Sequence, residues 1–142
     1  ALGFEHIGGY IPCALCLQER LPYYYGAPLM LFAAIIGRFG APAVVVRGLL
    51  LVGGLLMTWG MVMGIYHAGV EWHFWPGPTT CATSAPGVTT NVGDLLGDIN
   101  AKTPPACDAA ALRVLGLSFA GWNVVASVIL AAIAFRAAFK RA

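Results

Sequence analysis

The sequence predicts an all-α integral membrane protein, and two features support this fold class. Of the 142 residues, 59% are hydrophobic and only 10% are charged, whereas soluble domains carry about 25% charged residues. Three stretches without Asp, Glu, Lys or Arg, residues 21–37, 48–70 and 114–135, approach or reach the roughly 20 residues that a helix needs to cross a bilayer. Helices buried in a soluble core are the alternative, but this chain has too little polar sequence to cover three of them.

We expect the elements to follow one another in a single domain, with about three full spans and an N-terminal stub. The first residues are apolar but too few to cross a bilayer, so the chain is expected to lack most of its first membrane helix. In order, we expect the end of a first helix (1–12), a CxxC motif and second helix (13–37), a turn (38–47), a third helix (48–70), a long loop (71–113), a fourth helix (114–137) and a tail (138–142), all within the domain 1–142.

Two patterns within these elements predict packing. In the long loop, apolar residues recur at helical spacing and predict a short amphipathic helix on the membrane surface, with a loop packed on the bundle as the alternative. These residues are Val92, Leu95, Leu96 and Ile99. Glycines in the third helix could let neighbouring helices approach closely, although ordinary membrane composition explains them equally well. These are Gly53, Gly60 and Gly64.

The distribution of charge predicts the orientation. The turn at 38–47 and the residues after the last span carry five basic residues and no acid. The other side carries all six acids and three basic residues. Because Lys and Arg favour the cytoplasmic side, the turn and the C-terminus are predicted to face the cytoplasm and the long loop the outside. The net charge of +2 is too small to indicate nucleic-acid binding.

All four cysteines fall on the predicted outer side, where an even number fits disulfide chemistry. They are Cys13, Cys16, Cys81 and Cys107, and they permit three pairings. A zinc site is disfavoured because the second pair, 26 positions apart, does not form another CxxC, and we predict no metal. Purely structural disulfides are also disfavoured, because a CxxC ring is too short to stabilise much by loop entropy.

A redox relay explains more residues of the CxxC motif than a zinc site or a structural disulfide does. A thiolate is favoured at a helix N-terminus and beside a cation. Cys16 lies in the first turn of the predicted helix, and Arg20 follows on the same face one turn later. Arg20 reaching toward lipid phosphate is the alternative. The neighbouring Glu19 is expected to be a solvated interfacial acid.

The stretch CALCLQER before a membrane helix, with a second outer cysteine pair that begins at WPGPTTC, resembles the DsbB family of bacterial disulfide bond formation proteins. The likeness covers the cysteine motif, the three spans, the outer loop and the basic tail. It implies a DsbB-like four-helix transmembrane bundle in the bacterial inner membrane, with the cysteine loops facing the periplasm. The implied function is a thiol oxidase that reoxidises a DsbA-like periplasmic thioredoxin-fold protein and passes electrons to ubiquinone or menaquinone.

The resemblance also implies a role for each cysteine. By position, Cys81 matches the cysteine that forms the mixed disulfide with the partner. Cys107 matches its mate, which exchanges with Cys13. Cys16 matches the thiolate that meets the quinone ring, and Arg20 matches the arginine beside that quinone.

His67 is a further candidate for binding the quinone. A histidine at the end of the third helix could donate a hydrogen bond or a proton to a quinone oxygen, and an interfacial histidine satisfied by water is the alternative.

Two other functions stay open. One is a non-enzymatic membrane protein whose disulfides brace the outer loop. The other is a vitamin K epoxide reductase-like quinone reductase, although in that family the CxxC comes late in the bundle rather than first.

Overall fold

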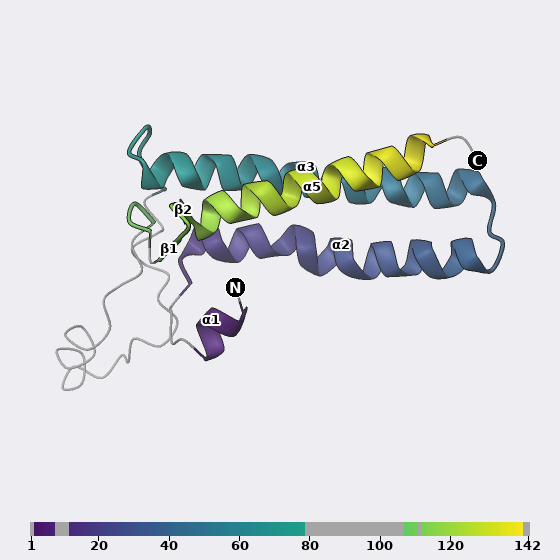
Figure 1. Ribbon diagram of the computed structural model, residues 1–142, viewed down its shortest axis with the longest axis horizontal. Helices are drawn as coiled ribbons and strands as arrows, with labels where there is room; N and C mark the ends of the chain where they lie inside the picture. The colour runs from purple at the N-terminus through teal and green to yellow at the C-terminus, as the bar shows by residue number, and fades with distance from the viewer. Residues whose placement is uncertain (1, 8–11, 79–106, 111, 141–142) are drawn as a thin grey trace.

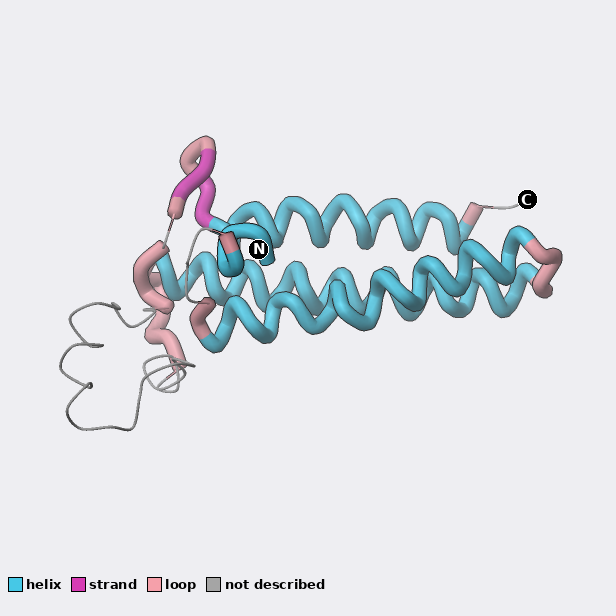
Figure 2. The backbone as a smooth tube through the Cα atoms, turned by 90° about the horizontal axis from the view of Figure 1, so that it is seen from below, coloured by secondary structure: helices cyan, strands magenta, loops and turns pink. Residues whose placement is uncertain are grey.

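In the described part of the chain, three long helices run side by side (Figure 1). The computed structural model describes residues 2–7, 12–78, 107–110 and 112–140. The elements are α1 (Leu2–His6), α2 (Ala14–Arg38), α3 (Ala43–Glu71), β1 (Arg113–Val114), β2 (Leu117–Ser118) and α5 (Phe119–Phe139). Because α3 packs against both α2 and α5, it is the central helix of this bundle. The short α1 lies near the start of α2, apart from the three long helices (Figures 1 and 2).

Glycines let α3 approach its neighbours closely. A Cβ placed on Gly60 would lie 3.2 Å from Ser127 Oγ on α5 and 3.4 Å from Pro22 Cγ on α2. A Cβ placed on Gly64 would lie 2.9 Å from Val124 Cγ2 on α5. Both glycines are buried, so they form a packing surface of the kind that small residues make between membrane helices. The packing interpretation of these two glycines is therefore confirmed.

A two-stranded hairpin, rather than a helix, precedes α5. β1 and β2 pair antiparallel around Leu115 and Gly116, whose φ angles are 53° and 84°. Left-handed backbone at both central residues is what a tight hairpin turn requires, and the glycine adopts it without strain. Ser118 then caps α5, because its Oγ accepts a hydrogen bond from a backbone N–H three residues later. The last helix therefore begins at Phe119 and not at residue 114, where the charge-free stretch begins.

α3 ends where its backbone turns left-handed at His73, with φ 58°. The N–H of His73 donates to the carbonyl oxygen of Val70 at 3.0 Å, and the N–H of Phe74 donates to that of Gly69 at 2.9 Å. These two bonds form a Schellman motif, which satisfies carbonyls that the helix end would leave unpaired. The chain thus reverses sharply at the end of α3 that carries the predicted site.

Two of the described helices, α3 and α5, are long and apolar enough to cross a membrane by length and composition. α2 spans 25 residues but does not meet the same criterion within the described chain. It contains Pro22 and Pro28 and three tyrosines, which lower its hydropathy. Of the three full spans that we expected, the structure therefore supports two, α3 and α5.

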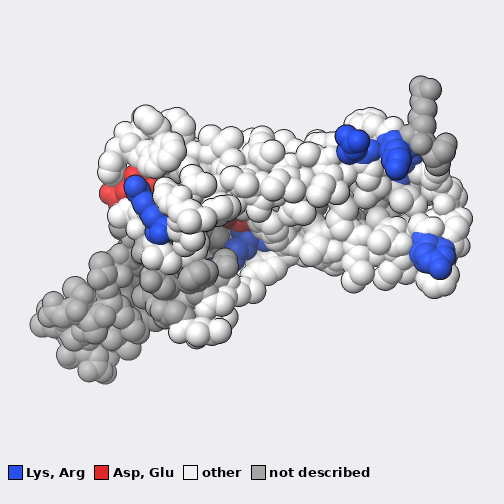
Figure 3. Space-filling model, in the orientation of Figure 1, with Lys and Arg blue, Asp and Glu red and all other residues white. Residues whose placement is uncertain are grey.

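The described charges divide between the two ends of the bundle. Basic side chains gather at the end where α2 turns into α3 and where α5 stops (Figure 3). They are Arg38, Arg47, Arg136 and Lys140. There the Arg47 guanidinium donates to the carbonyl oxygen of Lys140 at 3.4 Å, which ties α3 to the end of α5. The predicted amphipathic helix at 92–99 lies outside the described residues.

Candidate functional site

The two cysteines of the CxxC motif lie at the start of α2. Cys13 is the N-cap residue, and its Sγ accepts a hydrogen bond from the backbone N–H of Cys16 at 3.2 Å. The two Sγ atoms are 2.8 Å apart, and both residues are free cysteines. Cys16 therefore lies in the first turn of the helix, as predicted. The pair forms a dithiol at a helix N-terminus, where the partial positive charge of the backbone favours a thiolate.

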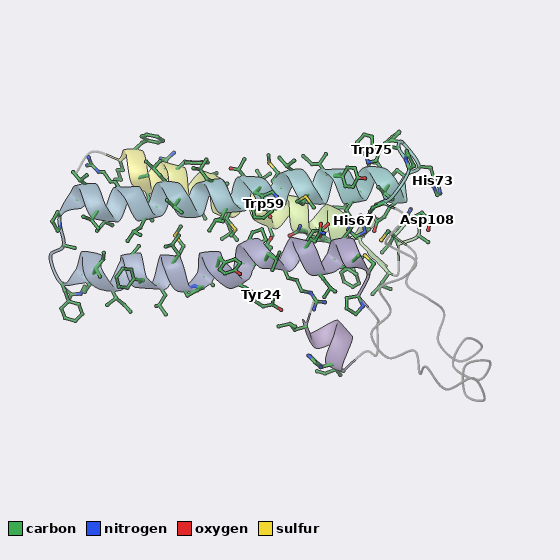
Figure 4. The ribbon with its side chains drawn as sticks, turned by 180° about the vertical axis from the view of Figure 1, so that it is seen from behind. Tyr24, Trp59, His67, His73, Trp75 and Asp108 are labelled. Atoms are coloured by element: carbon green, nitrogen blue, oxygen red, sulfur yellow. The ribbon has the colours of Figure 1, made fainter. Side chains whose placement is uncertain are left out.

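His67, on α3, contacts this dithiol. Figure 4 shows its side chain between α3 and α2, toward the end of the molecule that also carries His73 and Trp75. The Nε2 atom of His67 lies 3.7 Å from Cys13 Sγ, and its Nδ1 lies 2.7 Å from Glu19 Oε1. Only 3% of the residue is exposed. Both ring nitrogens of the predicted quinone-binding histidine therefore face protein groups.

Glu19 lies inside the bundle, so the expectation of a solvated interfacial acid is wrong. Only 7% of the residue is exposed. Its Oε1 contacts His67, and its Oε2 accepts a hydrogen bond from Asn123 Nδ2 at 3.0 Å. A buried carboxylate needs such partners to offset its lost hydration. Glu19 follows Cys16 by three positions and so shares its face of α2, which is the signal that could have indicated this role.

Polar side chains of α2 and α5 continue from this carboxylate. The hydroxyl of Tyr23 donates to Asn123 Oδ1 at 2.6 Å and lies 2.8 Å from Ser127 Oγ. Sequence reasoning missed these three residues, although two polar side chains one turn apart in the apolar α5 were a usable signal. We call His67, Glu19, Asn123, Tyr23 and Ser127 the polar chain. It links all three long helices at the level of the dithiol and just beyond it.

The contacts at Cys13 favour its thiolate. The hydrogen bond from the Cys16 thiol has the largest effect and, with the hydrogen bond of His67, lowers the pKa of Cys13 from 9.0 to about 4, although burial acts in the opposite direction. The two sulfurs share one hydrogen bond across 2.8 Å, and once Cys13 is ionised it is the Cys16 thiol that donates this bond. The geometry places the negative charge next to His67.

The other predicted site residues are Cys107, Cys81 and Arg20, and the structure describes two of them. Cys107 is buried, disulfide-bonded and packed in the same apolar cluster as Cys13. Cys81 lies outside the described residues. Arg20 is half-buried on α2, one turn after Cys16. The structure therefore brings cysteines of both predicted pairs to one end of the bundle.

Comparison with known families decides between the open alternatives. The family profile described as "Disulfide bond formation protein DsbB" matches residues 1–137. The chain belongs to the DsbB family. It is therefore a membrane protein of disulfide bond formation with disulfide oxidoreductase chemistry. No curated protein and no solved structure matches the chain.

The DsbB-family dithiol also resembles part of a metal site. Cys13, Cys16 and His67 each offer one ligand atom, and these atoms lie within 4.8 Å of one another. A structural zinc site requires four ligands, and the described residues add no fourth to this group. Three ligand atoms so close together can capture a metal ion, so thiol assays on this chain should contain a chelator.

The surroundings of the dithiol fit a quinone, the cofactor implied by the DsbB resemblance. A quinone ring requires an apolar wall, and its oxygens require polar partners. Cys16 and Met63 pack against the apolar cluster around Cys13. The oxygens need hydrogen-bond donors, and Arg20, one turn after Cys16 on α2, carries such N–H groups. By contrast, a hollow of about 450 Å³ at the opposite end of the bundle lies away from the thiols. It is lined by Phe135, Arg136, Phe139 and Lys140.

Proposed function

We propose that this chain is a quinone-dependent thiol oxidase of the bacterial inner membrane, with its cysteines facing the periplasm. It reoxidises a DsbA-like thioredoxin-fold protein and passes the electrons to ubiquinone or menaquinone in the bilayer. The observation that carries the proposal is the free Cys13–Cys16 dithiol, which sits at a helix N-terminus in contact with a buried histidine. A dithiol that exchanges electrons needs a stabilised thiolate, whereas a cysteine pair that only braces a loop does not.

Two cysteine pairs carry the electrons in series. The reduced partner attacks Cys81, and the sulfur of Cys107 that is released attacks the Cys13–Cys16 disulfide. The partner's second thiol then displaces Cys81, and Cys81 in turn displaces Cys13 from Cys107. Each displacement breaks one S–S bond and forms another, and each pair of displacements moves two electrons to the next cysteine pair. The packing of Cys107 in the cluster of Cys13 supports this order. The resulting Cys13–Cys16 dithiol then loses two electrons and two protons as its disulfide forms again.

The chain supplies position and charge, while the bound quinone accepts the two electrons and two protons. Cys16, Arg20 and His67 are the residues proposed to hold it, with His67 contacting it through the ring, since its two nitrogens face Cys13 and Glu19. Arg20 retains its charge near lipid and can stabilise negative charge that develops on an oxygen atom. Its place one turn after Cys16 keeps that charge near the reacting sulfur.

The test is quinone reduction by the purified chain in detergent, with a reduced thioredoxin-like donor and a chelator present. Cys16→Ser is the inactivating variant, and His73→Gln, at an exposed histidine outside the site, is the matched control. We expect turnover in the wild type and in His73→Gln, and none in Cys16→Ser. Absence of turnover in the wild type, with disulfides that resist mild reductant, would show that the cysteines only brace the loop.

A further inference from the structure

The polar chain is larger than the proposed electron route requires. Polar side chains between membrane helices are costly to bury and usually serve a function. The electron route uses the cysteines, Arg20 and one histidine, but it gives no role to Glu19, Asn123 or Tyr23. These residues nevertheless contact one another and His67 over distances of 2.6 to 3.0 Å.

The polar chain and the dithiol have the arrangement of a nucleophile, a base and a group that orients the base. Cys13 Sγ faces Nε2 of His67, and Nδ1 of the same ring faces Glu19 Oε1. With its Nδ1–H donated to the carboxylate, a neutral imidazole presents the lone pair of Nε2 to the thiol. This is the arrangement that activates cysteine and serine nucleophiles in unrelated folds. The 3.7 Å separation of sulfur and nitrogen suits a sulfur contact.

We propose that His67 is the catalytic base of the Cys13–Cys16 dithiol and that Glu19 is a positioning residue, held in turn by Asn123 and Tyr23. The proposal deepens the proposed function and rests on it. It adds a defined place for the first of the two protons that the dithiol loses. Because His67 faces the sulfur of Cys13, its part in the reaction is to accept that proton.

The proton steps balance without moving electrons. The S–H bond of Cys13 breaks, and an N–H bond forms at Nε2 of His67. Across the 2.8 Å contact, the proton of Cys16 can then pass to the Cys13 sulfur, which leaves the thiolate on Cys16. One base thus provides a thiolate at either sulfur. The second proton and both electrons leave when the S–S bond forms, with the quinone of the proposed function as the acceptor.

The charged and titratable groups around His67 support this role. From α2 it faces Glu19, whose negative charge stabilises a protonated imidazole. On its own helix, Glu71 Oε1 lies 3.9 Å from Nε2, so a second carboxylate flanks the ring. From α5, Asn123 and Ser127 reach Glu19 and Tyr23 with uncharged side chains. A proton on His67 therefore lies between two acids and beside the thiolate it came from.

Alkylation of Cys13 tests the base directly and needs no quinone. The reduced full chain in detergent is treated with iodoacetamide over a range of pH, and mass spectrometry reports the modification of each cysteine. At about pH 6 we expect His67→Gln to slow alkylation of Cys13 by about 3-fold, because the pKa of Cys13 rises when the hydrogen bond of His67 is lost while that of Cys16 remains. The control His73→Gln should match the wild type. An unchanged pH profile in His67→Gln would overturn the proposal.

Variants of Glu19 test the positioning role and remain informative if His67→Gln does not fold. Glu19→Gln keeps the shape but removes the charge, and we expect it to shift the pH profile of Cys13 in the same direction. Glu19→Asp keeps the charge and should restore part of the shift, which a merely structural role would not do. Equal profiles for Glu19→Gln and the wild type would refute the role of Glu19. Quinone reduction by the wild type, measured in parallel, tests the proposed function separately.

Discussion

The low pKa of the Cys13 sulfur predicts that acid destabilises the reduced protein. This pKa falls from 9.0 to about 4 through the hydrogen bonds of Cys16 and His67. Between these values the unfolded chain binds more protons than the folded one, so the thiolate contributes its full stabilisation above about pH 9 and loses it as the pH falls toward about 4. We expect the melting temperature of the reduced chain to decrease between about pH 8 and about pH 5.

The matched comparison is Cys13→Ser, which removes the titrating sulfur and keeps a side chain that can cap α2. Thermal unfolding of both reduced proteins in the same detergent measures the difference in their pH dependence. The slope should be shallower in the variant. Parallel curves would mean that other groups cause the acid sensitivity and that the Cys13 thiolate is not stabilised by folding.

At the residue scale, the sequence could indicate the thiols but not all of their surroundings. Cys13, Cys16 and His67 could be singled out because their chemistry is rare in apolar helices. Glu19 was harder to assign, since its spacing from Cys16 indicates only a shared helix face and a glutamate near a helix end is equally well explained by solvent. Its partners His67 and Asn123 lie 48 and 104 positions away in the chain. Only the packing of three helices brings them together.

At the scale of the elements, the glycines of α3 control how closely α5 approaches. A Cβ on Gly64 would lie 2.9 Å from Val124 Cγ2, whereas a Cβ on Gly48, in the same helix, would meet nothing within 4 Å. We expect Gly64→Ala to destabilise the protein by about 1–3 kcal/mol through overpacking. Gly48→Ala should be neutral or stabilise it by up to about 1 kcal/mol, because alanine favours the helix.

Unfolding of the two variants in detergent measures this contrast within one helix. Equal effects would mean that α3 and α5 do not meet at Gly64.

The ends of the helices were harder to predict than their existence. The absence of charge between residues 114 and 135 could not separate a hairpin from a helix, since Leu115 and Gly116 are as apolar as the residues that follow. Gly116 was the only local sign of a turn there.

At the scale of the whole molecule, the positions of the long helices and of the charged residues were easier to predict than the number of helices in the bundle. Hydropathy alone predicted long helices at α2, α3 and α5, and each is present. The four-helix bundle implied by the family is represented in the described residues by these three helices and the short α1. Successive membrane helices run in opposite directions, so the order of the motifs along the chain predicted that the dithiol and the basic cluster lie at opposite ends of the bundle.

The separation of the basic cluster from the dithiol sets the orientation that we predict for the protein. Arg38 is the last residue of α2 and Arg47 lies in the second turn of α3, and this end of the bundle also holds the C-terminus of α5 (Figure 1). Because basic residues are retained on the cytoplasmic side, a fluorescent protein fused after residue 142 should fluoresce in bacterial cells. Alkaline phosphatase at the same place should be inactive, and phosphatase inserted after Gly77 should be active.

Charge reversal shows whether these arginines cause the orientation. We expect Arg38→Glu combined with Arg47→Glu to reduce the fluorescence of the C-terminal fusion, because the cytoplasmic end then loses two of its basic residues. The matched control is Arg113→Glu, at the dithiol end, which should keep the orientation or strengthen it. Active phosphatase at the C-terminus of the unmodified chain would place the dithiol in the cytoplasm, where thiols are kept reduced. The proposed oxidation of a periplasmic partner would then be wrong.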